Sequence, residues 1–264
     1  MSYADAFHWF VYGHIAFGAL GLVAFWLPVV GKKGGLIHRY AGRVFGVTML
    51  ATGCFAILIS STTLIAPIET HPHLVAHPDF GSAASIRAIF GWMMLYLAIL
   101  TVTLAWYGWQ SVLVRGDRAR LRDWRNLGLH AVLFIASLNT AVRGVLIGQP
   151  LMIGISTIGF ATVATDLWYL YKPTPRPLDW LLEHIKALVG TGISVYTAFL
   201  AFGAVRLLPE AALTPALWSV PLIIGLALIL YHQRQVTKRM PKRTQSRSEA
   251  DAQDKVGTRA PLTS

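Results

Sequence analysis

Long apolar runs, separated by short polar or Gly- and Pro-rich segments, make up most of the chain. A helix needs roughly 20 apolar residues to cross the hydrocarbon layer of a bilayer. Seven runs are this long, at residues 7–30, 44–67, 86–114, 127–148, 151–171, 181–208 and 213–232. Lipid excludes open sheet edges, because their backbone groups would lack hydrogen-bond partners. The pattern therefore predicts an all-α protein, with a bundle of seven transmembrane helices in residues 1–232 and a disordered basic tail in residues 233–264.

The distribution of Lys and Arg predicts the orientation of this bundle. Of the 23 basic residues, 19 lie in four segments: 31–43, 115–126, 172–180 and 233–264. With seven crossings all four segments fall on one side of the membrane, and the connections on the other side carry no Lys or Arg. Basic loops stay on the cytoplasmic side. We therefore expect an outside amino terminus and a cytoplasmic carboxyl terminus, in a bacterial-type inner (plasma) membrane.

The amino-acid composition is typical of a membrane protein, and the distribution of charge limits the classes of binding partner that we expect. Only 13% of the residues are charged and 55% are hydrophobic, whereas a soluble domain carries about a quarter charged residues. The net charge of +11 would suit nucleic acid, but the basic tail lacks interleaved aromatic residues. The expected partner of the basic face is anionic lipid. Because Cys54 is the single cysteine, an intramolecular disulfide is excluded.

Ionisable residues inside the predicted helices are the first candidates for function, because they are costly in lipid. His130, Asp166, Glu183 and His184 fall at similar depth in the cytoplasmic half of three helices. Two histidines on neighbouring helices suit axial ligation of a b-type haem. Four ionisable groups at one depth also suit a proton relay. The alternative is a set of interfacial caps and snorkelling side chains without a ligand.

A second group lies in the outer half of the bundle. His14 is followed at i+4 and i+7 by Gly18 and Gly21, on the same helix face. This pattern indicates either a groove for close helix packing, with the imidazole hydrogen-bonded to a neighbour, or a flat cavity for a planar cofactor with His14 as a ligand. Arg143, with Asn139 one turn before it, falls at a similar level and could share a polar site with His14.

The outer connection between the second and third predicted helices is rich in potential metal ligands. Within eleven residues it contains Glu69, His71, His73, His77 and Asp79. Imidazole and carboxylate groups bind Zn²⁺ or Cu²⁺, so a divalent-metal site is one interpretation. A solvated loop, or a lid that responds to pH through histidine titration, are the others.

Two segments resemble an uncharacterised family of bacterial multi-pass membrane proteins that carry a domain of unknown function. The first is GKKGGLIHRYAGRVFGVTM together with the histidine of the preceding helix, and the matching residues are His14, Lys33, Gly34, His38, Arg39, Gly42, Arg43 and Met49. The second is WLLEHIKALVGTGISVYTAFLAF, with Trp180, His184, Gly190, Thr197, Ala198 and Phe199. The resemblance implies a helical membrane architecture and importance for these histidines. It implies no particular activity.

A fainter similarity runs to cytochrome b561-like proteins, which also have a turn containing His-Arg and Gly-Arg between helices. That resemblance implies histidine pairs that hold haem between neighbouring helices at both membrane faces. This sequence departs from the pattern, because its second, third and fifth predicted helices contain no histidine. One inner haem between His130 and His184 remains consistent with it.

Three classes of function follow from these observations. The first is a membrane redox or cofactor-binding protein that depends on His130 and His184, with His14 at a second site. The second is a transporter of ions or small molecules, with gates near Arg143 and Glu183. The third is a non-catalytic sensor, assembly or structural protein that forms a homo-oligomer or binds a membrane partner. No nucleophile triad, GxSxG, HExxH or P-loop motif occurs, so the sequence does not favour a hydrolase or an ATPase.

Overall fold

The computed structural model describes residues 2–76, 82–203 and 215–239, and these residues form helices and no strand. The long helices are α1 (Tyr3–Val30), α2 (Leu36–Ile65), α5 (Met94–Val114), α7 (Trp124–Leu146), α8 (Pro150–Tyr171), α9 (Asp179–Ala198) and α11 (Pro215–Arg239). The short elements are α3 (Pro67–Thr70), η1 (Pro72–Leu74), α4 (Ala83–Ile86), η2 (Arg87–Met93), α6 (Arg118–Leu121) and η3 (Phe199–Gly203). The predicted all-α class is confirmed.

Five helical segments are long and apolar enough to cross a membrane. They are α1, α2, the continuous stretch Ala83–Val114, α7 and α8. In the Ala83–Val114 stretch, 61% of the most apolar window is buried inside the protein, against 22% in α1. The protein is therefore a membrane-embedded helical bundle in which α5 is the central helix and α1 is peripheral.

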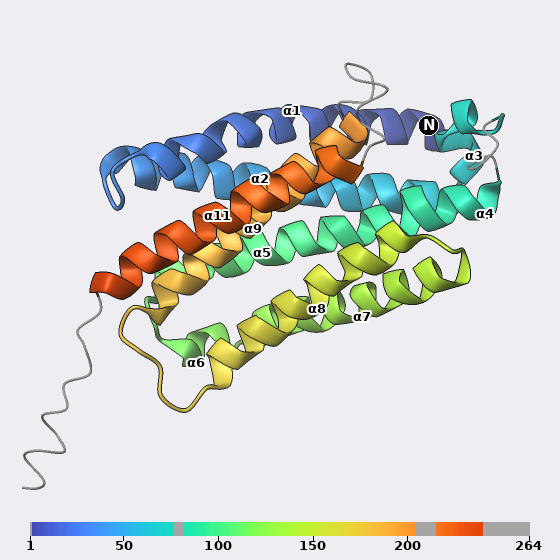
Figure 1. Ribbon diagram of the computed structural model, residues 1–264. Helices are drawn as coiled ribbons and strands as arrows, with labels where there is room; N and C mark the ends of the chain where they lie inside the picture. The colour runs from blue at the N-terminus through green and yellow to red at the C-terminus, as the bar shows by residue number, and fades with distance from the viewer. Residues whose placement is uncertain (1, 77–81, 204–214, 240–264) are drawn as a thin grey trace, which may run out of the picture.

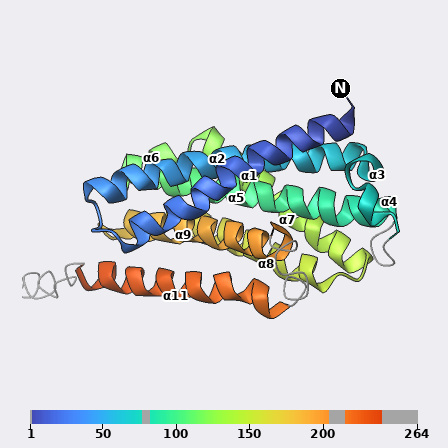
Figure 2. The ribbon, with the colours of Figure 1, turned by 90° about the horizontal axis from the view of Figure 1, so that it is seen from above.

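The helices run side by side along one common direction (Figure 1). Helix α5 packs against α2, α7 and α9, while α1 covers α2 and α8 pairs with α7. Helix α11 packs along α9 (Figure 2). Two groups of buried apolar side chains fill the interior: one between α5 and the α7–α8 hairpin, around Tyr107 and Leu133, and one between α1, α2 and α5, around Phe25 and Met49.

The basic connections lie at one end of this bundle. Figure 1 shows the turn 31–35, the helix α6 and the segment 172–178 together at that end, where α11 also finishes. The amino-terminal end of α1 and the short helix α3 lie at the opposite end. We call the first end the basic end. The predicted gathering of the cations is thus a property of the fold.

Two helices differ in length from the predicted segments. Helix α2 begins at Leu36 rather than at 44, so that His38, Arg39 and Arg43 lie on a helix and not in a loop. Arginine side chains can reach the interface from a helix end, which is why charge alone does not mark the boundary. Helix α11 continues to Arg239, so the first seven residues of the predicted tail are helical, and residues 240–264 lie outside the described part.

Two helices contain irregular turns. Helix α9 runs without interruption through Gly190 and Gly192. The backbone changes to π-helical turns at Phe199–Gly203 and at Arg87–Met93. In the second of these, the Nε of Arg87 donates a hydrogen bond to the backbone carbonyl of Leu64 at 3.1 Å.

Candidate functional site

A cavity of about 1220 Å³ opens at the basic end, between α1, α2, α5, α9 and α11. Its walls are apolar and aromatic, with Phe45 from α2, Trp109 from α5 and Leu188 from α9 among them. Three histidines line it, which are His38, His184 and His232. The volume exceeds the 300–1,000 Å³ that is usual for small-molecule sites, so the cavity can hold a ligand of cofactor size.

The end of α1 holds His38 in place. The last carbonyls of a helix have no partner within the helix, and here the Pro28 carbonyl, 3.0 Å away, is hydrogen-bonded by Nδ1 of His38. The ammonium of Lys33 donates to the carbonyls of Pro28 and Val29. Partial burial in this turn lowers the pKa of Lys33. The α1–α2 turn thus caps α1 and orients the imidazole of His38.

His184 is oriented in the same way from the opposite side of the cavity. Its Nδ1 lies 3.0 Å from the backbone carbonyl of Gly108 on α5. A Cβ at Gly108 would lie 2.8 Å from the Leu188 side chain and 3.0 Å from Ala187. A glycine is therefore needed for α9 to approach α5 this closely, and the close approach brings His184 to the carbonyl.

The two imidazoles face each other across the cavity. Their ring centroids are 6.5 Å apart, and the ring planes are inclined at 68°. Because a carbonyl only accepts hydrogen bonds, Nδ1 of His38 and of His184 must each carry the hydrogen. A neutral ring then has a bare lone pair on Nε2. Donation from one ring nitrogen to a backbone carbonyl is the usual arrangement of metal-ligating histidines.

Cations without carboxylate partners surround this histidine pair. The described residues that line the cavity include five cationic side chains and no Asp or Glu; the cations are Lys33, Arg39, Arg43, Arg115 and Arg239. Among the described residues none of the four arginines forms an ion pair, since each ion pair there involves Asp166, Asp179 or Glu183. We call these five residues the cation rim. The rim favours a ligand with negative groups at the basic end.

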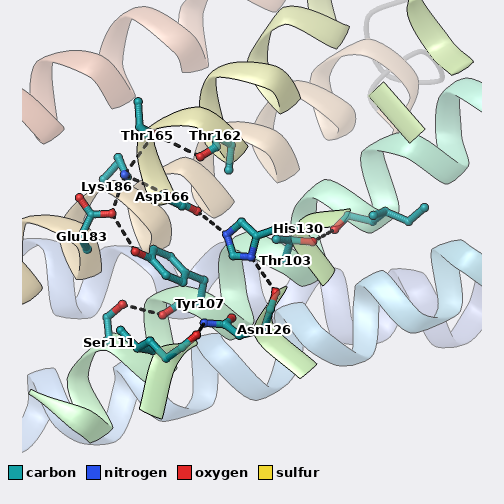
Figure 3. A network of polar contacts seen from close by, with 12 residues as sticks. Thr103, Tyr107, Ser111, Asn126, His130, Thr162, Thr165, Asp166, Glu183 and Lys186 are labelled. Carbon is teal, nitrogen blue, oxygen red and sulfur yellow. Dashed lines mark hydrogen bonds and ion pairs between the residues drawn. The ribbon is translucent and has the colours of Figure 1, made fainter. Parts of the chain in front are cut away.

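A cluster of paired charges joins α5, α7, α8 and α9 (Figure 3). In the cluster, Nε2 of His130 on α7 is 3.0 Å from Oδ2 of Asp166 on α8, and Nζ of Lys186 on α9 is 2.8 Å from Oδ1 of the same carboxylate. Lys186 also pairs with Glu183 at 2.6 Å, and the Tyr107 hydroxyl donates to Glu183 at 3.0 Å. Four helices contribute to this ionic cluster.

The members of the ionic cluster differ in how far their side chains are buried. The side chains of His130 and Asp166 are 2% and 0% exposed, and those of Glu183 and Lys186 are 13% and 22% exposed. Lys186 is also hydrogen-bonded to Thr165, an exposed residue of α8, at 3.2 Å. Buried charges require partners of this kind, and here every one of the four charged groups has one.

A second carboxylate anchors the start of α9 at the basic end. Asp179 pairs with Lys172, accepts a hydrogen bond from the backbone of Arg176 at 2.7 Å and pairs with its guanidinium at 3.0 Å. Burial alone would raise the pKa of Asp179, but the donors of Lys172 and Arg176 outweigh it and hold the pKa below its usual value. The connection between α8 and α9 is therefore fixed by charge.

The sequence-predicted group on α1 is a packing groove in the structure. The Nδ1 of His14 lies 3.1 Å from the backbone carbonyl of Thr52 on α2. A Cβ at Gly21 would lie 2.0 Å from the methyl group of Met49 and 2.9 Å from the Thr48 hydroxyl, so a larger residue would displace side chains between the two helices. Arg143, in contrast, donates to Asn139 at 2.9 Å and lies 4.6 Å from the ring of Trp92. His14 and Arg143 therefore make separate contacts rather than one shared site.

The outer histidines gather around aromatic rings. His71 is buried, with Nδ1 3.0 Å from the Thr70 hydroxyl and its ring 4.8 Å from Phe90. Burial, together with neighbouring His73, lowers the pKa of His71 to about 4. Glu69 and His73 are exposed. In the described part of the chain no three His, Cys, Asp or Glu side chains could together hold a metal ion, so the described members of the predicted metal set do not form a site, and His77 and Asp79 lie outside the described residues.

The structure pairs the predicted inner histidines differently from the expectation. Asp166, Glu183 and His130 do come together, but both ring nitrogens of His130 are engaged, one by Asp166 and the other by the Asn126 carbonyl at 2.7 Å. His184 faces His38 instead. Sequence reasoning overlooked Lys186, although a lysine inside an apolar helix was a usable signal. Nothing in the sequence indicated that Tyr107 belongs to this cluster.

Comparison with known proteins gives no relative: no family model, no curated protein and no solved structure matches the chain. The geometry of the site is therefore the basis on which we infer a function.

Proposed function

We propose that this protein is a haem-binding protein of the bacterial inner membrane, with His38 and His184 as the axial ligands of a b-type haem. The arrangement of these two imidazoles carries the proposal. In the neutral form each ring has its hydrogen on Nδ1 and a lone pair on Nε2, and the ring centroids are 6.5 Å apart. Two metal–nitrogen bonds of about 2 Å each, together with the two ring radii, give a separation of this size.

The residues around the pair fit a porphyrin in three respects. The cavity has the volume, and its walls offer flat aromatic surfaces such as Trp109 and Phe45. The cation rim supplies partners for two carboxylates at the end of the bundle where water is close. Haem supplies one-electron redox chemistry. The chain would hold and orient the group, exclude water from its apolar face and neutralise its carboxylates.

The proposal includes the number of membrane crossings and the orientation of the chain. Helices α9 and α11 lie alongside the five apolar segments, and we infer that they also cross the bilayer, which gives seven spans. The basic end then faces the cytoplasm, with the amino terminus outside. The haem would lie near the cytoplasmic surface, in reach of soluble electron carriers and beside anionic lipid headgroups.

An absorption spectrum of the detergent-purified protein tests the ligation. We expect a Soret band with the bis-histidine signature, and its loss in His38→Ala and in His184→Ala. The matched control is His73→Ala, because His73 is an exposed histidine outside the cavity. Purified protein that takes up no haem when hemin is added, or His38→Ala protein with an unchanged spectrum, would overturn the proposal.

A further inference from the structure

The hydrogen bonds of His130 require one more proton than a neutral imidazole beside a carboxylate would contain. Its Nδ1 lies 2.7 Å from the Asn126 backbone carbonyl, which can only accept, so Nδ1 carries a hydrogen. In a neutral ring Nε2 is then a bare lone pair. It lies 3.0 Å from Oδ2 of Asp166, which is also a lone pair when the carboxyl group is ionised. Two acceptors cannot remain at this distance when their side chains are only 2% and 0% exposed.

We infer that His130 and Asp166 form a proton-binding site inside the membrane domain, with a single proton held between Nε2 and Oδ2. The proton can be covalently bound to the imidazole, which gives an imidazolium–carboxylate pair. It can equally be bound to the carboxyl group, which gives a neutral pair. Both forms have the same number of protons and no net charge. The inference is independent of the proposed haem.

The groups that face the pair come from every helix packed around it. From α9, Lys186 touches the other carboxylate oxygen at 2.8 Å and is itself paired with Glu183. From α5, the ring of Tyr107 lies 5.3 Å from the His130 ring, edge to face. From α7 itself, the Asn126 carbonyl fixes Nδ1. The Lys186 ammonium favours an ionised Asp166, and therefore the imidazolium form.

The connectivity indicates that the site stores a proton rather than conducting one. The contacts run from His130 through Asp166, Lys186 and Glu183 to Tyr107, whose ring returns to His130 (Figure 3). A closed ring of contacts leads to neither face of the membrane. Its partly exposed edge is at Glu183, Lys186 and Thr165. His130 and Asp166, which hold the proton, lie at the buried side of the ring.

Nitrogen-15 NMR of histidine-labelled protein, combined with infrared spectroscopy, tests the inference. Between about pH 6 and pH 9, where an ordinary histidine loses its proton, we expect no titration of the pair. The spectra should show either a doubly protonated His130 ring or a protonated Asp166 carboxyl group throughout. A singly protonated His130 together with an ionised Asp166 would overturn the inference.

Two variants assign the signals. In Asp166→Asn the amide can donate to Nε2, so the pair keeps its shape without the extra proton, and His130 should become singly protonated at Nδ1. In His130→Gln the histidine signal disappears and Asp166 should ionise. If neither variant folds, the pH-independent signals of the wild-type protein decide the question, because the other eight of the nine histidines serve as internal references.

Discussion

Charged side chains form two regions that meet along α5 and α9, and the two regions differ in charge balance. In the ionic cluster His130 and Lys186 face two carboxyl groups, and the distances between them are 2.6–3.0 Å. In the cation rim five cations face no carboxylate of the described residues. Both regions use α5 and α9. Tyr107 and Glu183 contact each other in the cluster, while their chain neighbours Gly108 and His184 form the hydrogen bond that orients His184 in the cavity.

The difference indicates that charge stabilises the fold in the ionic cluster and favours ligand binding in the cation rim. A balanced buried cluster joins helices, and here it ties the α7–α8 hairpin to α9, which α8 otherwise touches little. The cation rim around the apolar cavity has no carboxylate partner within the described part of the chain. Its counter-charge must therefore come from ions in water, from lipid or from a ligand. We therefore expect the cluster to respond to substitution through stability and the rim to respond through ligand affinity.

Removal of a carboxylate from the cluster is expected to have the largest effect. Asp166→Ala leaves Nε2 of His130 without its partner and Lys186 with Glu183 as its one remaining carboxylate among the described residues. Loss of one member of a buried pair costs about 3–5 kcal/mol. The free energy of unfolding in mixed detergent measures it. Arg176→Ala is the control, because its side chain is 56% exposed and exposed pairs contribute about 0–1 kcal/mol. Equal losses for both variants would remove the distinction between buried and exposed pairs.

Asp179 should give a smaller effect that depends on pH. Its pKa is lower in the folded protein than in the unfolded chain, so its ion pairs contribute stability above about pH 4 and lose it as the pH falls through the folded value. Asp179→Asn should therefore lower stability by about 1–2 kcal/mol at neutral pH and make little difference in acid. Thermal unfolding from neutral pH downward measures this.

The control for that experiment is Asp123→Asn. Asp123 is the N-cap of α7, and asparagine caps a helix as well as aspartate does. A loss in Asp179→Asn that stays constant down to the lowest pH would show that the charge of Asp179 is not its source.

Charge reversal in the rim should leave the fold intact and weaken haem binding. Arg39→Glu or Arg43→Glu replaces an attraction by a repulsion near the carboxylates of the ligand, worth about 1 kcal/mol or roughly fivefold in affinity. Hemin titration monitored at the Soret band measures the affinity. Arg120→Glu is the matched control, since Arg120 lies at the same end but does not line the cavity. If all three variants lose affinity equally, the effect belongs to overall charge.

Added salt should produce the smallest difference between the two regions. The Debye length falls from about 10 Å at 0.1 M to about 3 Å at 1 M salt, and buried pairs are screened least. We expect haem affinity to fall by at most a fewfold in 1 M salt. The stability difference between wild type and Asp166→Ala should remain unchanged, and a difference that shrinks with salt would place the cluster in contact with solvent.

Local patterns predicted the helices well and the contacts between them less well. Hydropathy located each long helix within a few residues at most ends, because apolar length is a property of the chain itself. The start of α2 was missed by eight residues, and with it the helical position of His38. Proximity in depth correctly suggested that His130, Asp166 and Glu183 belong together. The same reasoning wrongly grouped His184 with them, because the depth of a residue in the membrane does not determine which neighbouring helix its side of α9 faces.

The sequence by itself determined that this is a helical membrane protein whose cations gather at one end, since both properties follow from residue type and order along the chain. Only the tertiary structure decided which histidines face each other. Adjacent residues on a helix point about 100° apart, so Glu183 and His184 had to serve different neighbours. Which neighbours these are was set by the close contact at Gly108 and by the turn that brings His38 onto the end of α1.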